Sequence, residues 1–420
     1  MRRVPAPEKS AVAQWTPSAR ELDDLELLGM GVLAVDGFTA PSPAGPPALT
    51  LAVPTEVADR GEVELLDPEG LPLARVAVRE TYQLPDADDG LVGVVGPVRP
   101  LTAPQFGPFR RFVRAPADLP PAERLAVPVV APLTQEAVVD VATTAAERDA
   151  TPLLVICTGT GTPQGVSAPA LVRAGLAAAL AIDGAEVVAV PVASRGDRGA
   201  DTALRETVAA AYGSVHRPRA DGTLAPDVAA LVEQDRPPRH RRGVVIFLTG
   251  LSGSGKSTIA RAVHDLLLER GDRTVTSLDG DVVRHHLSKG LGFSRADRET
   301  NIARIGWVAA EISRHHGVAL CSPIAPFDST RQQVRAMVDA AGGGFVLIHV
   351  ATPLEECERR DRKGLYAKAR AGVIPEFTGI SSPYEIPADA DLTVDTTGRD
   401  LDECVDEVMV LLRDAGWLAG

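Results

Sequence analysis

The chain has 420 residues, 45% of them hydrophobic, and a formal net charge of -13 at pH 7. Because a single core seldom exceeds about 250–300 residues, this length predicts two or three domains in a globular protein. The negative charge argues against a nucleic-acid-binding surface and favours an enzyme whose anion-binding sites are local pockets. No apolar run has membrane-spanning length, and the first residues lack the apolar segment of a secretory signal. We therefore expect a cytoplasmic protein with neither membrane nor nucleic acid among its partners.

The first half begins with a Pro-rich, polar arm over residues 1–20. From Glu21 the pattern predicts a short helix, a turn at residues 29–31 and an apolar segment. Short alternating runs between residues 48 and 98 are separated by Pro, Gly and Asp-Pro-Glu-Gly turns, which indicates a small β-rich domain. A Pro-rich connector is predicted over residues 99–121.

The periodicity changes over residues 123–212, where strand-like apolar runs alternate with Ala-rich helical stretches. Such alternation predicts a second, α/β domain with parallel strand pairing. Residues 213–242 are polar and predict a linker around one short helix, so we place a domain boundary there.

A longer α/β series follows Gly243 and predicts a doubly wound parallel sheet, with ligands beyond the carboxyl ends of its strands. The predicted strands cover residues 244–248, 274–278, 318–321, 345–350 and 392–394. The predicted helices cover residues 257–269, 300–315, 329–341, 354–359 and 401–414.

The segment from Gly250 to Ser257 fits the phosphate-binding pattern G-x-x-x-x-G-K-[ST]. Its glycines let backbone N–H groups surround an anion, and the following helix directs its positive end at the same phosphates. Lys256 can reach the β- and γ-phosphates, and the Ser257 hydroxyl can hold Mg²⁺. The alternative, a Gly/Ser-rich turn with a chance lysine, is disfavoured by the flanking strand and helix. The sequence therefore predicts a nucleotide-binding P-loop.

Charged side chains also follow other predicted strands of this series. Asp279 and Asp281 come after residues 274–278, where a carboxylate can orient Mg²⁺ or accept a proton from an attacking hydroxyl. A plain Asp-Gly turn is the alternative. Arg298 and Asn301 are three residues apart near a helix start and can grip an anionic substrate, although a solvated, salt-bridged helix end would look the same.

A glycine-punctuated polar segment begins at residues 362–366 and continues through residues 377–380. It is too long for a tight turn, and beside a P-loop it predicts a lid that closes and excludes water. A mobile surface loop is the alternative.

The histidine pairs 285–286 and 315–316 raise metal binding as an alternative, but adjacent helical residues face different ways and no third ligand stands out. We therefore expect no metal at the histidine pairs. The four cysteines are also scattered without ligand spacing, which is typical of buried reduced thiols in a cytosolic protein. They are Cys157, Cys321, Cys357 and Cys404.

Five segments, in order LTGLSGSGKST, LDGDVVR, LGFSRADRETNIARIG, DRKGLYAKARAG and FTGISSPYEIP, resemble the adenylylsulfate (APS) kinase family over about residues 243–415. Members of that family use MgATP to phosphorylate the ribose 3′-hydroxyl of adenosine 5′-phosphosulfate, a step in sulfate assimilation. The resemblance implies an α/β P-loop kinase with ATP and Mg²⁺ as cofactors, APS as small-molecule substrate, and a homodimeric assembly.

The resemblance also implies roles for individual residues. ATP would be held by Gly250, Ser252, Gly253, Ser254, Gly255, Lys256, Ser257 and Thr258. Mg²⁺ would be held by Ser257 and Asp279, and catalysis would involve Lys256, Asp279 and Asp281, with either aspartate as the base. APS would be surrounded by Asp281, Arg284, Phe293, Arg298, Asn301, Ile324, Lys363 and Phe377.

Two positions depart from that family. Ala303 stands where the family often has arginine, and Ala325 stands where some members carry a serine that can be phosphorylated. Neither change touches the P-loop or the two aspartates, so we still expect activity.

The first half resembles ATP sulfurylase, which makes APS from ATP and sulfate, and implies a PUA-like β domain followed by a Rossmann-like domain. The sulfurylase motif Q-x-R-N-x-x-H-x-x-H is absent from the matching stretch, residues 129–141, and no histidine precedes His216. The later G-R-D-H-A-G segment is missing as well. We therefore expect a degenerate, non-catalytic module that acts as a scaffold, a dimerisation surface or a docking site for an active sulfurylase. The expected domains are residues 1–118, 119–235 and 236–420.

Three other interpretations remain open at this point. A P-loop kinase of the gluconate or nucleoside type has no reason to share all three of the segments DGD, LGFS…DR…N and FTGI. A bifunctional sulfurylase–kinase is disfavoured by the missing histidines. A nucleotide-binding regulator without turnover is disfavoured by the intact Lys256 and aspartates.

Overall fold

The computed structural model describes residues 12–41, 48–84, 90–219, 221–292 and 294–419. Its contacts divide the chain into two compact units, Met1–Arg236 and Pro237–Gly420. Across the part of the chain that is described, no helix is both long and apolar enough to cross a membrane.

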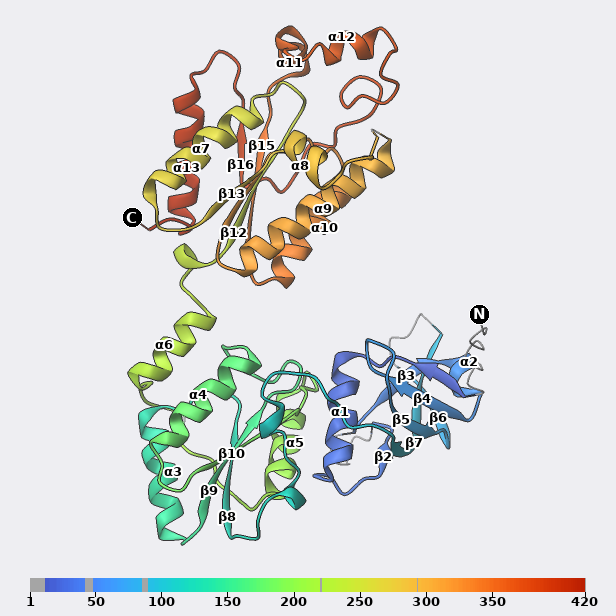
Figure 1. Ribbon diagram of the computed structural model, residues 1–420, viewed down its shortest axis with the longest axis vertical. Coiled ribbons are helices and arrows are strands. Elements are labelled where there is room, and N and C mark those ends of the chain that lie inside the picture. Colours follow the sequence, from blue (N-terminus) through green and yellow to red (C-terminus); the bar gives the residue numbers. More distant parts are fainter. Residues whose placement is uncertain (1–11, 42–47, 85–89, 220, 293, 420) are drawn as a thin grey trace, which may run out of the picture. The chain divides into compact units, whose positions relative to one another are not determined.

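A β-rich layer forms the start of the first unit, as predicted for residues 48–98 (Figure 1). Its strands are β1 Ala13–Trp15, β2 Gly37–Phe38, β3 Leu51–Pro54, β4 Glu62–Leu66, β5 Pro72–Ala77, β6 Glu80–Gln83 and β7 Leu91–Pro100, and the short helix α2 Thr55–Ala58 follows β3. The long strand β7 organises the layer, because β2, β3, β5 and β6 all pair with it in antiparallel register. The prediction of a polar arm over residues 1–20 is wrong for residues 13–15, which form β1 and pair with β4. Residues 1–11 of that arm lie outside the described residues.

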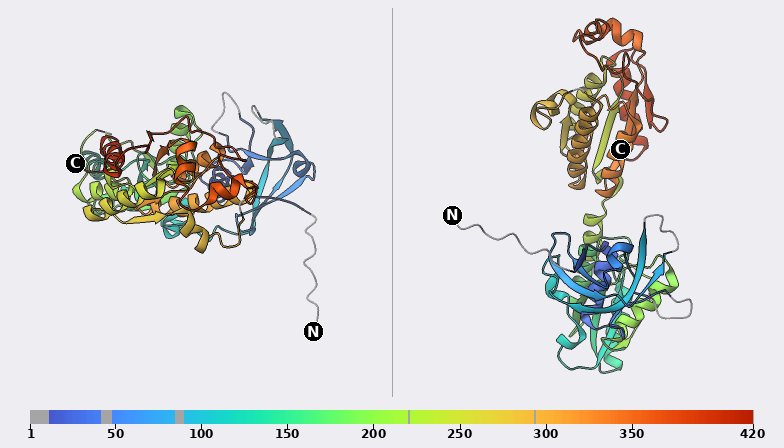
Figure 2. Two further views of the ribbon diagram at one scale, coloured as in Figure 1. Left: turned by 90° about the horizontal axis from the view of Figure 1, so that it is seen from above. Right: turned by 90° about the vertical axis from the view of Figure 1, so that its right-hand side faces the viewer.

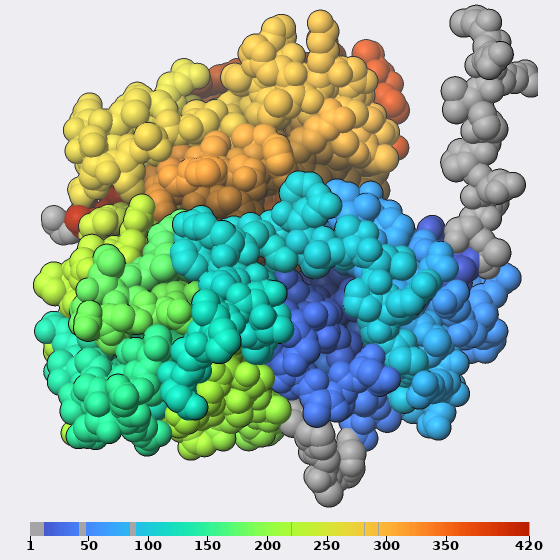
Figure 3. Space-filling view, turned by 60° about the horizontal axis from the view of Figure 1, so that its bottom comes forward, coloured from blue at the N-terminus to red at the C-terminus, as the bar shows by residue number. Residues whose placement is uncertain are grey.

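Helix α1, Ala19–Met30, joins the two parts of the first unit. It begins at a capping box between Ser18 and Glu21 and ends at Gly31, whose φ of 65° suits glycine. Leu25 packs in the core of the β-rich layer, whereas Leu27 packs in the core of the next layer. In the space-filling view, dark-blue residues of this region lie between the light-blue β-rich part and the teal part (Figure 3).

The rest of the first unit is the predicted α/β layer. Four parallel strands, β8 Arg124–Val129, β9 Thr151–Cys157, β10 Glu186–Val190 and β11 Ser214–Val215, stand in the order β10-β9-β8-β11. The helices are α3 Gln135–Glu147, α4 Ala168–Leu180, α5 Arg198–Ala210 and α6 Pro226–Asp235, and short 3₁₀ helices span Arg110–Phe112 and Pro116–Asp118 in the predicted connector. Apolar runs such as Leu153–Cys157 are fully buried, which is typical of a sheet covered on both faces.

The second unit is a five-stranded parallel sheet in the order β13-β14-β12-β15-β16. Its strands are β12 Val244–Thr249, β13 Val275–Leu278, β14 Val318–Cys321, β15 Gly344–Val350 and β16 Leu392–Val394. All five predicted strands are confirmed, and so is the α/β fold with parallel sheets. The 3₁₀ helix Arg239–Arg241 precedes β12.

Helices cover both faces of this sheet (Figure 2). They are α7 Lys256–Arg270, α8 Gly280–His286, α9 Arg295–Arg314, α10 Asp328–Ala340, α11 Leu354–Arg360, α12 Leu365–Arg370 and α13 Leu401–Asp414. α7 and α13 pack on one face, α9 and α10 on the other. Sequence analysis missed the short helices α8 and α12 and began α9 five residues late. The Ser294 hydroxyl accepts the N–H of Asp297, and this cap starts α9 at Arg295.

Candidate active site

The P-loop turns sharply between β12 and α7. Strand β12 is buried throughout, and Gly250 leaves it with φ 148°. A Cβ atom at Gly250 would lie 2.4 Å from the carbonyl oxygen of Val350, so only glycine fits this close approach of two backbones. Gly255, with φ 103°, then precedes the first residue of α7, Lys256. The helix therefore starts at the loop and directs its N-terminal N–H groups to it.

Two threonine hydroxyls form hydrogen bonds to the backbone of the P-loop. The hydroxyls of Thr352 and Thr396 donate to the carbonyl oxygen of Ser254 at 2.9 and 3.0 Å. The ammonium of Lys256 is buried and donates to the carbonyl oxygen of Leu251 at 2.6 Å. These bonds hold the loop backbone in one shape and keep the lysine beside it.

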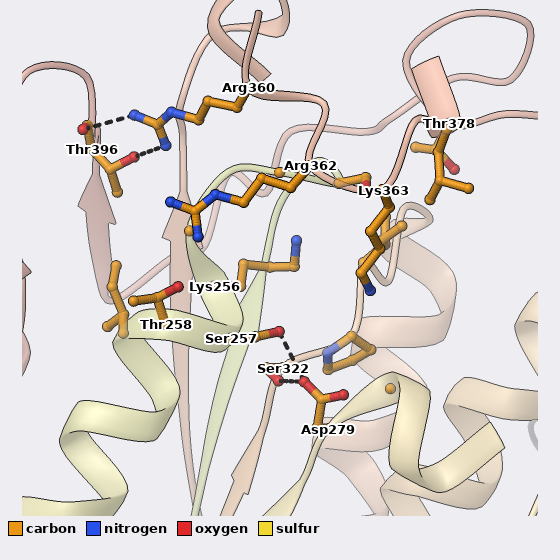
Figure 4. Close-up of a pocket in the computed structure, with 18 of the residues that line it drawn as sticks. Lys256, Ser257, Thr258, Asp279, Ser322, Arg360, Arg362, Lys363, Thr378 and Thr396 are labelled. Carbon is orange, nitrogen blue, oxygen red and sulfur yellow. Dashed lines mark hydrogen bonds between the residues drawn. The ribbon is translucent and has the colours of Figure 1, made fainter. Parts of the chain in front are cut away.

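Asp279 connects the P-loop to two neighbouring strands (Figure 4). Its Oδ2 accepts the hydroxyl of Ser257 at 2.8 Å and the hydroxyl of Ser322 at 3.1 Å. Asp279 follows β13, Ser322 follows β14 and Ser257 lies in α7, so three elements of the sheet's carboxyl edge meet at one carboxylate. A carboxylate with two hydroxyl oxygens is an oxygen donor set of the kind that Mg²⁺ prefers, so these residues fit that cation.

A cavity of about 960 Å³ opens above this carboxyl edge. Of the residues predicted to hold ATP, it is lined by Ser252, Gly253, Gly255, Lys256, Ser257 and Thr258. Gly250 instead makes the turn below, and Ser254 is fully buried. Of the residues predicted to surround APS, it is lined by Arg284, Arg298, Asn301, Ile324, Lys363 and Phe377, and Asp279 lines it as well. Asp281 is placed only by its backbone, in the first turn of α8, and Phe293 lies outside the described residues.

Arg298 is hydrogen-bonded within the protein through its two terminal nitrogens, whereas its Nε has no partner among the described residues. Its guanidinium donates to the hydroxyls of Thr378 at 2.9 Å and Ser382 at 3.1 Å. It therefore ties α9 to the segment after α12. One turn along the same helix, Asn301 is buried, and its Oδ1 has no hydrogen-bond partner among the described residues. An unpaired buried amide that lines a cavity is suited to a ligand donor.

The predicted lid is held by apolar side chains as well as by polar ones. Tyr366 and Phe377 meet edge to face with ring centroids 4.9 Å apart, and they pack with Cys357 against Leu251 of the P-loop. The Tyr366 hydroxyl also donates to the carbonyl oxygen of Ser252 at 2.8 Å. The prediction of a polar segment from residue 362 to residue 380 is therefore corrected, because this segment contains helix α12 and a small apolar core.

Several cavity residues were missed by sequence reasoning. Among them, Arg360 donates to the hydroxyl of Thr396 at 2.8 Å. Arg362, in the predicted lid, and Lys363, predicted to surround APS, follow it between α11 and α12. Figure 4 shows Arg362 and Lys363 across the cavity from Ser257. Hydrogen bonds from Arg359 and then Arg360 lower the pKa of Glu356 to about 2, so this carboxylate stays charged beside them. The run of charged residues ERRDRK at positions 358–363 was the sequence signal from which these cavity residues could have been found.

A buried network supports the floor of the cavity. The Thr249 hydroxyl donates to the carbonyl oxygen of Ile324 at 2.6 Å. Ala325, with φ 43°, is a strained non-glycine position, and its carbonyl oxygen accepts a hydrogen bond from the fully buried Arg331 at 2.9 Å. The rings of His349 and Tyr384 stack beside it with centroids 5.7 Å apart.

The histidine pair 285–286 lies at the end of α8 with its rings edge to face. Among the residues that the structure describes, no group of three or more His, Cys, Asp or Glu side chains could hold a metal ion. All four cysteines are buried and free.

Comparison with known protein families finds a match for part of the chain. Residues 242–395 match the family model described as adenylylsulphate kinase. The curated relatives include sulfate adenylyltransferases from Neosartorya fischeri and Aspergillus fumigatus, each 50% identical over 192 residues. The match covers 46% of this chain and 33% of each relative, so the chain spans about a third of the length of these proteins.

Solved structures resemble different shares of the chain. A hexameric APS kinase from Thiobacillus denitrificans matches with a TM-score of 0.77 and 28% identity, over 97% of this chain and 94% of that one. An APS kinase from Mycobacterium tuberculosis, solved with AMPPNP and APS, is 46% identical over 42% of this chain and 99% of its own, with a TM-score of 0.40. The first of these structures shares the architecture of both units.

Proposed function

Residues 242–395 belong to the adenylylsulphate kinase family, and on this premise we propose that the second unit is an APS kinase. The reaction transfers the γ-phosphate of ATP to the 3′-hydroxyl of adenosine 5′-phosphosulfate and yields 3′-phosphoadenylylsulfate. The observation that carries the proposal is the meeting of the P-loop with Asp279 in one large cavity. A volume of about 960 Å³ lies at the upper end of ordinary ligand pockets, as two nucleotides together require.

ATP occupies the P-loop side of the cavity in this proposal. The backbone of residues 250–258 surrounds the phosphates, and Lys256 moves from the Leu251 carbonyl to the transferring group. Arg362 and Lys363 approach from the lid side, so positive charge lies on both sides of the γ-phosphate (Figure 4). Phosphoryl transfer depends mainly on such positioning and charge neutralisation.

APS occupies the α9 side. The Asn301 side chain is buried and its Oδ1 has no hydrogen-bond partner among the described residues, so it is offered to this nucleotide. Phe377 presents its ring from the lid, and Arg284 and Ile324 line the same part of the cavity. Arg298 contributes by holding Thr378 and Ser382, which keeps the lid over the substrate.

Ser257 and Asp279 are the residues that hold Mg²⁺ in this proposal, with Ser322 oriented behind them. The ion supplies charge that neutralises the β- and γ-phosphates. Either Asp279 or Asp281 accepts the proton of the 3′-hydroxyl, and the two are kept as alternative bases. A lid packed on the P-loop excludes water, so the phosphate reaches the hydroxyl of APS.

The first unit is proposed to be a degenerate sulfurylase-like module, with residues 1–118 as its PUA-like part and residues 119–235 as its Rossmann-like part. Residues 129–141, where sulfurylases carry their histidines, leave β8 and enter α3 without a histidine or an arginine. This segment therefore supplies no basic side chain to the leaving pyrophosphate. Residues 236–420 complete the proposed three-part division.

The assembly and location are also proposals. The chain acts as a cytoplasmic homodimer, and the first unit serves as a docking surface for an active ATP sulfurylase. Buried reduced thiols are consistent with that compartment.

The deciding experiment measures ADP release by the purified full chain with MgATP in three parallel reactions, with APS, with sulfate and with neither. Turnover with APS alone supports the proposal. Pyrophosphate release that depends on sulfate would instead support the bifunctional alternative. Absence of turnover in all three, despite ATP binding, would make the chain a nucleotide-binding regulator.

A matched pair of variants tests whether the activity comes from this cavity. Lys256→Ala removes the P-loop ammonium and is expected to abolish turnover. Lys289→Ala removes an exposed lysine of the second unit that does not line this cavity and is expected to leave turnover unchanged. Equal activity of the two variants would contradict the proposed site.

A further inference from the structure

The parallel sheet of the first unit has a reversal in its strand order. β9 pairs on one side of β8 and β11 pairs on its other side, in the order β10-β9-β8-β11. In open parallel sheets, ligands bind in the crevice outside the carboxyl ends at such a reversal.

A cavity of about 280 Å³ lies at this reversal. Its walls are the segment after β8 (residues 128–134), the first turn of α3, one face of α5 and the segment after β11 (residues 217–219). The segment after β11 is fixed in place, because the N–H of Arg219 donates to Asp140 and the N–H of Gln135 donates to the carbonyl oxygen of Thr223. The cavity is therefore bounded by defined backbone.

Positive charge dominates the lining. Three arginines, Arg205, Arg217 and Arg219, face one carboxylate, that of Glu206. The opposite wall is apolar and includes Val129, Leu133 and Ala137.

Arg205 has unused hydrogen-bonding capacity. Its side chain is only 16% exposed, and its sole carboxylate contact among the described residues is Asp201 at 3.7 Å, beyond hydrogen-bond distance. Asp201 instead accepts the Ser194 hydroxyl and the N–H of Arg195. An arginine side chain carries several N–H donors, and such groups are ordinarily satisfied when they are mostly buried.

Arg217 can turn to a ligand at little cost. It pairs with Glu206, but its own side chain is 68% exposed, and exposed ion pairs contribute little to stability. An incoming dianion can replace Glu206 as its partner. Arg219, 69% exposed, lines the same cavity and forms a similarly exposed ion pair with Asp221, which a ligand can also replace.

We propose that this cavity binds a small organic phosphate, with the phosphate among the three arginines and the organic body against the apolar wall. The described lining holds no histidine, lysine or aspartate, so we assign it binding without turnover. This site is separate from the kinase cavity, and it gives the first unit a ligand of its own.

Hydrogen exchange followed by mass spectrometry on the full chain tests the proposal, because peptides from the two units report separately. The probes are AMP and inorganic phosphate, each titrated to about 10 mM. We expect AMP to slow exchange in peptides covering residues 128–140 and 200–219, independently of the peptides covering the P-loop. Slowing by AMP but not by phosphate shows that the apolar wall contributes; equal slowing by both restricts the ligand to its phosphate group. No slowing by either probe overturns the proposal.

Three variants assign the effect to the arginines. Arg205→Ala is expected to weaken the AMP-dependent protection about tenfold or more, since it removes the buried charged donor. Arg217→Ala, at an exposed position that does not support the fold, is expected to weaken it about threefold. Arg173→Ala changes an exposed arginine on α4 outside the cavity and should leave it unchanged. Exchange in β9 checks that each variant is folded. Undiminished protection in folded Arg205→Ala and Arg217→Ala proteins would overturn the proposal.

Discussion

The hydroxyl of Tyr384 lies 3.0 Å from the hydroxyl of Thr249, the last residue of β12 before the P-loop. Thr249 donates its only hydroxyl hydrogen to the carbonyl oxygen of Ile324, because a carbonyl can only accept. Tyr384 must therefore donate to Thr249. Since Tyr384 follows the lid segment, this bond fastens the far end of the lid to the base of the P-loop.

Replacing Tyr384 by phenylalanine removes that bond and keeps the ring. A hydrogen bond of this kind contributes about 0.5–1.5 kcal/mol, so we expect kcat/KM for APS to fall roughly 2- to 10-fold. The KM for ATP should change less, because the P-loop keeps its other braces. Tyr82→Phe is the control, since the buried hydroxyl of Tyr82 has no partner among the described residues. Equal effects of Tyr384→Phe and Tyr82→Phe would contradict a specific role of the Tyr384–Thr249 hydrogen bond in holding the lid.

His349, stacked on Tyr384, predicts a pH dependence of stability. Burial, and then the positive charge of Arg331, lowers the pKa of His349 from its ordinary 6.5. The unfolded chain therefore binds more protons than the folded one between the lowered pKa and about 6.5. Stability should fall as pH drops through this window and be constant above it.

Thermal unfolding at pH 7.5 and at several values below 6.5 measures this effect. The His349→Gln variant should show a smaller decline than the parent, and His315→Gln, at an exposed residue, should not. A decline of the same size in both variants would mean that other groups cause it.

Asp279→Asn tests the carboxylate at the centre of the site. The amide keeps the shape but lacks the charge that orients Ser257 and fits Mg²⁺, so turnover should fall about 100-fold or more. Unfolding should change little. Asp265→Asn, on the exposed side of α7, is the matched control. Turnover that survives in Asp279→Asn would remove this residue from the proposed mechanism.

Gly250→Ala tests the close approach of the P-loop to β15. The substituted Cβ would meet the Val350 carbonyl at 2.4 Å, in addition to a backbone cost of about 1–3 kcal/mol. We expect loss of ATP binding by calorimetry and a lower unfolding temperature. Gly342→Ala, at φ 76° with no atom within 4 Å, carries the backbone cost alone. ATP binding should persist there.

Arg195→Met tests the first unit. Arg195 donates to both carboxylate oxygens of Asp24, at 2.7 and 2.5 Å, and Asp24 is fully buried. Leaving that charge without its partner should cost about 3–5 kcal/mol and lower the unfolding transition of this unit. Arg60→Met, at an exposed arginine, should have little effect. If Arg195→Met and Arg60→Met both unfold at the same temperature as the parent, the Arg195–Asp24 ion pair contributes nothing to the stability of this unit.

The P-loop could be predicted because its geometry depends on neighbours in sequence. Gly250 and Gly255 are required by the turn itself, and Lys256 follows at fixed spacing. The lid core could not be predicted in the same way. Tyr366 and Phe377 are eleven residues apart without helical or strand periodicity, and their contact depends on how α12 folds back on Leu251.

Longer-range pairs left still weaker signals. Tyr384 and Thr249 are 135 residues apart, and nothing local marks them as partners. Arg298 was recognised as important, but its partners Thr378 and Ser382 come from the lid, so its contacts there could not be predicted. The start of α9 is different, because the Ser294 cap could have been read from the sequence.

Thr396, whose hydroxyl braces the carbonyl of Ser254, stands one residue beyond the segment that matches the kinase family. Further along, the indole of Trp417 lies so close to Gly344 that a Cβ there would be 1.8 Å from it, and Trp417 belongs to the core under β12. A fragment limited to residues 242–395 would therefore contain the segment that matches the kinase family, but it would lack Thr396, which holds the P-loop, and Trp417, which packs in the core. An expressed fragment of the second unit should therefore extend beyond Trp417.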